Sequence, residues 1–65
     1  EFAAVYPSGT KVRTNEGEIG IVLRQNKHFS DRPVIRIIVD KDGKETNVIK
    51  DLLEIKNIYI EEVIE

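Results

Sequence analysis

The sequence contains no cysteine, so a disulfide framework and a thiolate metal site are both excluded for this chain. It has no methionine or tryptophan, a single histidine, two tyrosines and two phenylalanines. So few aromatic side chains offer little material for stacking nucleic-acid bases. No apolar run is long enough to cross a bilayer, and no stretch resembles a secretory leader. We therefore expect a cytoplasmic location and no membrane partner.

The length of 65 residues predicts one domain with one modest core, and we expect it to be a fragment of a larger protein. The net charge of −2 suits a soluble surface, but the charge is unevenly placed. Residues 1–36 carry six basic and four acidic side chains, whereas residues 37–65 carry four lysines and eight acids. The scatter is typical of a solvated surface, although a basic face in the first half would suit an anionic partner.

The stretch from Asn15 to Arg24 is the most informative part of the chain. Asn15 to Gly17 has the composition of a tight turn, and the residues after it alternate with the period of a half-buried strand. We expect Ile19 and Ile21 to face the core. Gly20 is unusual within a strand, and it indicates a bulge, a sharp bend or the close approach of another backbone.

Similar alternation and turn signals predict five short strands in all, a count typical of a small barrel or sandwich. The expected strands are Lys11–Thr14, Glu18–Gln25, Val34–Val39, Glu45–Ile49 and Ile58–Ile64. The last segment, Lys50–Glu65, also partly fits a helical stripe, but its β-branched residues favour a helical turn at Asp51–Glu54 followed by a strand. The Glu61–Glu62 pair breaks the alternation and predicts a bulge or an edge.

Catalytic constellations are missing from the sequence. His28 stands alone in a polar stretch, Asn26–Pro33, which we interpret as the longest irregular loop, with Phe29 tucked beneath it. Asp40, Asp42 and Glu45 lack the spacing of a full calcium loop and predict a hairpin turn. We expect no catalytic residue, no metal ligand and no cofactor in this chain, and hence no enzyme activity of its own.

These patterns also predict a core and an interaction surface. The expected core comprises Val12, Ile19, Ile21, Leu23, Ile35, Ile37, Val39, Val48, Leu52, Ile60 and Val63. The candidate interaction surface is the expected loop with its flanking cations, namely Arg24, Lys27, His28, Phe29, Arg32 and Arg36. A purely structural alternative for Arg32 and Arg36 is a cross-strand pair with Glu18 or Asp31.

The order of motifs resembles the small tail that follows the catalytic domain in many bacterial HD-domain phosphohydrolases of the HD-GYP type. The resemblance covers nearly the whole chain from Tyr6 onward. It rests on Tyr6-Pro7-x-Gly9, Gly17-x-Ile19-Gly20-x-Val22, Arg24-Gln25-Asn26, Arg32-Pro33-Val34-Ile35-Arg36, Asp51-Leu52 and Ile58-x-Ile60-x-x-Val63-Ile64. His28 to Asp31 depart from the pattern, which expects more asparagine and proline there. A weaker resemblance, through residues 9–22, is to the KOW element of ribosomal and transcription proteins.

The first resemblance implies an SH3-like barrel. Together with the five expected strands and the helical turn, it gives an all-β, five-stranded, SH3-like barrel with a short helical turn before its last strand. It further implies a non-catalytic accessory domain of a metal-dependent phosphodiesterase acting on a cyclic dinucleotide, whose histidine and aspartate ligands lie outside this chain. The expected partner is then the neighbouring catalytic domain or another subunit. The KOW resemblance supplies the alternative, a nucleic-acid-binding module. A third hypothesis is self-association through an exposed strand edge at Ile58 to Ile64.

Overall fold

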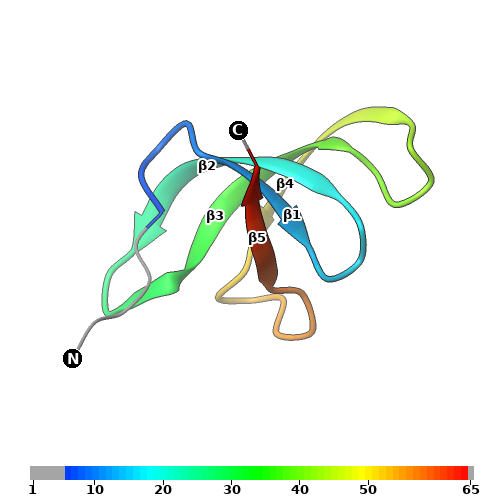
Figure 1. Cartoon of the computed structure of the whole chain (residues 1–65). Helices are drawn as coiled ribbons and strands as arrows, with labels where there is room; N and C mark the ends of the chain where they lie inside the picture. Colours follow the sequence, from blue (N-terminus) through cyan, green and yellow to red (C-terminus); the bar gives the residue numbers. More distant parts are fainter. Residues whose placement is uncertain (1–5, 65) are drawn as a thin grey trace.

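A computed structural model describes residues 6–64, which form one antiparallel sheet of five strands (Figure 1). The spatial order is β4-β3-β2-β1-β5, so β4 and β5 are the two edges of the sheet. The strands are β1 (Lys11–Thr14), β2 (Ile19–Asn26), β3 (Phe29–Val39), β4 (Glu45–Asp51) and β5 (Ile60–Ile64). The predicted all-β, small barrel-like class is confirmed.

The inner face of the curled sheet is closed by the chain between β4 and β5, residues 52–59, called the connector below. Its Leu52 and Ile58 are buried together with strand residues in one core cluster, and Ile55 packs against that cluster. The connector begins with a single turn, in which the amide of Ile55 donates to the carbonyl of Asp51 at 3.0 Å. That turn is the predicted helical turn, and no helix occurs within residues 6–64.

Only some of the residues that the sequence predicts for the core are buried. Val12, Ile35, Ile37 and Leu52 are buried as predicted, whereas Val22, Val34 and Ile58 are buried without having been predicted. Of the remaining expected core residues, Ile19, Ile21, Leu23, Val39 and Ile60 are half-buried, and Val48 and Val63 are exposed.

The prediction for β2 was wrong because both phases of this strand are apolar. Gly20 pairs with Val12 on one side and Ile37 on the other, and Val22 pairs with Ile35. Directly paired residues share a face of the sheet, so Gly20 and Val22 lie on the face that is turned toward the core. Ile19, Ile21 and Leu23 belong to the other phase.

The strand pairing is irregular at two positions where the sequence predicts an irregularity. The pairing of β2 with β3 shifts register between Ile19 and Gly20, where a bend was expected. The pairing of β1 with β5 shifts between Arg13, opposite Glu62, and Thr14, opposite Ile60, so Glu61 is the extra residue of a bulge. The predicted bulge and the predicted edge therefore coincide in β5.

Residues 26–33 do not form the long loop that the sequence predicts. β2 and β3 continue to the pair Asn26–Phe29, and only Lys27 and His28 make the turn. His28 supplies the left-handed backbone, with φ of 70°, that a tight hairpin turn needs and that glycine or asparagine usually provides. Pro33 is buried inside β3, where the register against β2 is interrupted and a missing N–H is tolerated.

Candidate interaction surface

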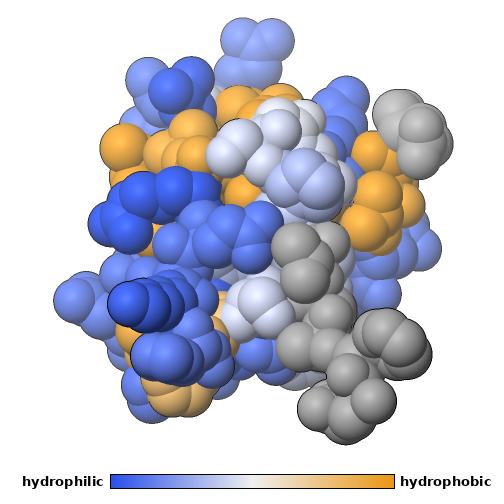
Figure 2. All heavy atoms as spheres, turned by 90° about the vertical axis from the view of Figure 1, so that its left-hand side faces the viewer, coloured by the Kyte–Doolittle hydropathy of each residue, from blue (hydrophilic) through white to orange (hydrophobic). Residues whose placement is uncertain are grey.

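Four of the six candidate surface residues lie near the end of the β2–β3 hairpin. Lys27, His28 and Phe29 occupy the turn and the first position of β3, and Arg24 lies two residues before the last position of β2. All four are exposed, and 49% of Phe29 is accessible to solvent, so Phe29 is not tucked under a loop as expected. Figure 2 looks onto the side of the molecule that carries this hairpin and shows separate hydrophobic areas among hydrophilic atoms.

Arg32 has a different role, because its guanidinium binds the connector. Its Nε donates to the carbonyl of Leu52 at 2.6 Å, and its Nη2 donates to the carbonyls of Ile55 at 2.9 Å and Ile58 at 2.7 Å. A longer contact of 3.3 Å reaches the carbonyl of Lys56. The Arg32 side chain thus donates hydrogen bonds to several carbonyls of the connector, which is not part of a strand. The cross-strand pair considered for Arg32 is not formed.

The neighbouring polar residues of the Arg24-Gln25-Asn26 motif also hold the chain together. Gln25 Nε2 donates to the carbonyl of Tyr6 at 2.6 Å. Asn26 Nδ2 donates to the carbonyl of Arg32 at 2.7 Å and to Oδ1 of Asp51 at 2.8 Å. Sequence reasoning missed these contacts.

Arg36 lies away from the hairpin end, in the middle of β3 on the outer face of the sheet. It pairs with Ile21 of β2 and with Ile49 of β4. Ile21 also pairs with Lys11 of β1, and Lys11 pairs with Ile64 of β5. These five residues, one from each strand, form a single cross-strand row that we call the outer row. It is Ile49, Arg36, Ile21, Lys11 and Ile64.

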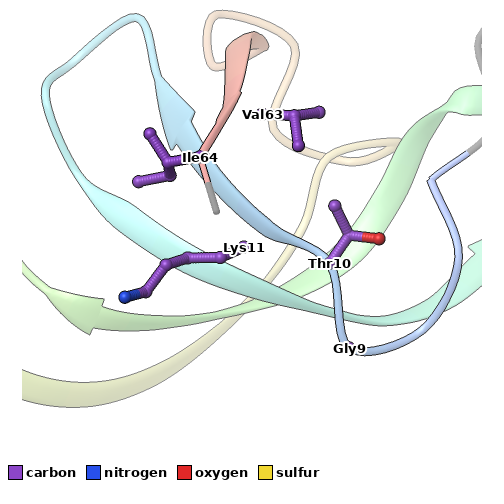
Figure 3. A pocket seen from close by; sticks show the side chains of 5 residues that line it. All are labelled: Gly9, Thr10, Lys11, Val63 and Ile64. Atoms are coloured by element: carbon purple, nitrogen blue, oxygen red, sulfur yellow. The ribbon is translucent and has the colours of Figure 1, made fainter.

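A surface hollow of about 330 Å³ lies at the β5 end of the outer row. It is lined by Lys11 and Ile64 of the row, together with Gly9, Thr10 and Val63. In Figure 3 the side chains of Lys11 and Ile64 point to one side of the strands, and those of Thr10 and Val63 point to the other. The hollow is therefore lined from both sides of the strands, at the end of the sheet where β1 meets β5.

The buried polar residues form a structural cluster rather than an acid–base site. Thr14 and Glu18 are buried, and the hydroxyl of Thr14 accepts from the amides of Glu16 and Glu18 at 3.2 Å and donates to the Glu18 carboxylate at 3.1 Å. Lys50 Nζ lies 2.7 Å from the other carboxylate oxygen of Glu18. Glu18 thus pairs with Lys50, and the alternative pairing with an arginine was wrong.

We expect Lys50→Met to lower the free energy of unfolding by about 1–2 kcal/mol, because Glu18 keeps its burial but loses its counter-charge. The figure is below that of a fully buried pair because the Lys50 side chain is 25% exposed. Urea denaturation measures the change. Lys44→Met, at an exposed turn position, is the matched control and should cost under about 0.5 kcal/mol. Equal losses in the two variants would contradict the role of the ion pair.

No group of three or more histidine, cysteine, aspartate or glutamate side chains suited to a metal ion occurs in the described part of the chain. Oδ1 of Asp40 accepts from the amides of Asp42 and Lys44 at 2.9 Å, so the acidic stretch forms the expected hairpin turn. Within residues 6–64, no helix is long and apolar enough to cross a membrane.

A comparison with protein families matches residues 11–65 to the family described as "KOW domain associated with HD domain". The match covers all five strands and most of the chain. Comparisons with curated proteins and with solved structures give no significant match. The family is that of an accessory domain that accompanies HD domains and not that of a catalytic domain.

Proposed function

Because the chain belongs to the family of KOW domains associated with HD domains, we propose that it is a non-catalytic contact module of an HD-domain phosphohydrolase. The parent protein we propose is a bacterial, cytoplasmic enzyme of the HD-GYP type, as the motif resemblance implies. Its metal ligands and its phosphodiesterase chemistry lie in the HD domain. The KOW-type domain described here binds the HD domain, or another subunit, and positions it.

The hairpin end supports a contact role because it combines an aromatic side chain with cations on a well-ordered support. Phe29 is half exposed, and Lys27 and Arg24 are exposed close to it in sequence. The hairpin backbone is tied to the rest of the domain by the Asn26–Asp51 hydrogen bond and by Arg32. Aromatic and arginine side chains presented on a rigid scaffold are typical anchors of protein interfaces.

The proposal is tested with the HD domain encoded by the same gene, produced as a separate protein. Calorimetric titration should show binding to the 65-residue chain, and Phe29→Ser should weaken it at least about tenfold. Tyr59→Ser is the matched control, because Tyr59 is 48% exposed against 49% for Phe29 and lies on the connector. The absence of binding, or of an HD domain in the gene, would contradict the proposal.

Nucleic-acid binding is the second candidate, favoured by the KOW description of the family. Lys11, Arg24, Lys27 and Arg36 are exposed cations, and Phe29 is an exposed aromatic ring suited to stacking. Titration with single-stranded RNA and duplex DNA at low salt separates the two functions. Binding that weakens steeply with salt would establish this second function, and no binding at high micromolar concentration would remove it.

A further inference from the structure

The last strand, β5, contributes little to the buried core. It is an edge strand beside β1, drawn in red in Figure 1. Glu61, Glu62 and Val63 are exposed, and Ile60 and Ile64 are half-buried. The buried residues of the core cluster come from β1, β2, β3 and the connector, and Ile60 is the member of β5 that packs against them. The core is therefore nearly complete before β5 is added.

The attachment of β5 to β1 is also weak. The register joins four pairs of residues and is interrupted at Glu61, the extra residue of the bulge. The ion pair between Arg13 and Glu62 links the two strands, but its side chains are 42% and 48% exposed, so water screens it. A short, interrupted ladder at the edge of a sheet opens more readily than a central one. We therefore expect β5 to detach while the rest of the domain stays folded.

The chain is held in place up to the residue before β5. Arg32 donates to the carbonyl of Ile58 at 2.7 Å. The amide of Asn15 donates to the carbonyl of Tyr59 at 3.0 Å, and the amide of Tyr59 donates to Oδ1 of Asn15 at 2.8 Å. These contacts do not involve β5, which begins at Ile60. The joint between Tyr59 and Ile60 is therefore the expected hinge.

The edge of β1 that β5 covers has specific requirements for the segment that pairs with it. Val12 stands opposite Val63, and Arg13 stands opposite Glu62. The edge thus accepts an extended segment that carries a carboxylate followed by a β-branched side chain. A second copy of this chain carries the same segment in its own β5. The structure therefore shows which sequence fits this edge and in which register.

We infer that β5 is an exchangeable strand through which two copies of this domain form a reciprocal dimer. The β5 of each copy leaves its own β1 and pairs with β1 of the other copy, so the ladder and the Arg13–Glu62 ion pair form again between the copies. The dimer therefore sacrifices no contact of the monomer. The inference concerns self-association and does not depend on the proposed contact with an HD domain.

The exchange also creates a contact that the monomer lacks. Tyr59 lies at the hinge, beside Asn15 at the end of β1, so in a two-fold symmetric exchange the hinges of the two copies lie close to the symmetry axis. Tyr59 is 48% exposed in the monomer, and its ring is free to pack against the other copy. This added contact favours the dimer once the concentration is high enough to offset the entropy of association.

The test is a complementation between two charge reversals, Arg13→Glu and Glu62→Arg, in the 65-residue chain. Within either variant alone, positions 13 and 62 carry like charges, both in the monomer and in an exchanged dimer. When the two variants are mixed, reciprocal exchange places opposite charges together in both ladders. Analytical ultracentrifugation of the mixture should therefore show at least about fivefold more dimer than either variant alone at the same total concentration.

Two controls separate exchange from general attraction between unlike molecules. The double variant Arg13→Glu/Glu62→Arg restores the ion pair within one chain and should form no more dimer than the natural protein. A mixture of Lys27→Glu with Glu54→Arg has the same two net charges as the test mixture, but both changes lie at exposed positions outside the β1–β5 ladder. This second mixture should show no gain of dimer.

Hydrogen exchange of the natural protein tests the opening of β5 without any variant. Backbone amides of β5 should exchange at least about tenfold faster than those in the ladder between β2 and β3. Equal protection of the two ladders would overturn the inference, because β5 would then open only when the whole domain unfolds. An unchanged amount of dimer in the test mixture, or an equal gain in the Lys27→Glu and Glu54→Arg mixture, would also overturn it. So would a dimer that forms to the same extent in each ladder variant without mixing, which indicates pairing of intact sheet edges.

Discussion

Arg32→Ala is expected to lower the free energy of unfolding by about 3 kcal/mol, the largest effect of any single polar substitution in this chain. The guanidinium donates to the carbonyls of Leu52, Ile55 and Ile58, three positions along the connector that closes the core. Without it, partly buried carbonyls lose a charged donor, and Leu52 and Ile58 lose the restraint that keeps them in place. A domain of this size is stabilised by only about 3–10 kcal/mol, so the variant should lose roughly a third or more of its stability.

Urea denaturation followed by circular dichroism measures this loss. Arg36→Ala is the matched control, because it removes an exposed arginine from the same strand and should cost under about 0.5 kcal/mol. Arg32→Lys should recover only part of the stability, since one ammonium group cannot donate along the two directions of the guanidinium fork. An Arg32→Ala variant as stable as Arg36→Ala would show that the connector does not depend on Arg32.

Gly20→Val is expected to destabilise the domain by about 2 kcal/mol, more than the ~1 kcal/mol range of strand propensities. A Cβ at this position would lie 3.2 Å from the carbonyl oxygen of Arg36 and 3.2 Å from Cδ1 of Ile35. It would also lie 3.4 Å from Cδ1 of Ile37. The two methyl groups of valine would then have to displace buried isoleucines and a backbone carbonyl.

The thermal midpoint should fall by about 10 °C for a domain of this size. Gly20→Ala should lie between the natural protein and Gly20→Val, because it adds only the tight Cβ contact. Asn47→Val places the same side chain at an exposed position of edge strand β4 and should leave the midpoint within about 3 °C. An unchanged midpoint for Gly20→Val would refute the close approach of β3 to Gly20.

The candidate surface could be predicted only in part from the sequence, because the type of a residue does not show whether its side chain is exposed or binds another segment of the chain. Arg24, Lys27 and Arg32 are equivalent as cations in the sequence, yet Arg32 binds backbone carbonyls while the other two are exposed. The outer row had no sequence signal at all. Its members come from five strands and become neighbours only through the pairing register.

The misinterpretation of residues 26–33 as a loop has a specific physical cause. Polar composition between Asn26 and Pro33 suggested a loop, but strand pairing depends on backbone groups, and His28 adopts the left-handed conformation that lets the hairpin continue to Phe29. The distribution of polar and apolar residues could not show this, because the turn residue was neither glycine nor asparagine.

The sequence by itself determined the all-β class, the turns at Gly17 and Gly43, the irregularity at Gly20 and the bulged edge at Glu61, because each depends on local backbone preference or on a short pattern. Only the tertiary structure decided which face of β2 is inside. Ile19 and Ile21 are as apolar as Val22, so hydrophobicity favours neither phase. Space at Gly20 accounts for the choice, because a Cβ there would lie 3.2 Å from the buried side chain of Ile35 and 3.2 Å from the carbonyl oxygen of Arg36.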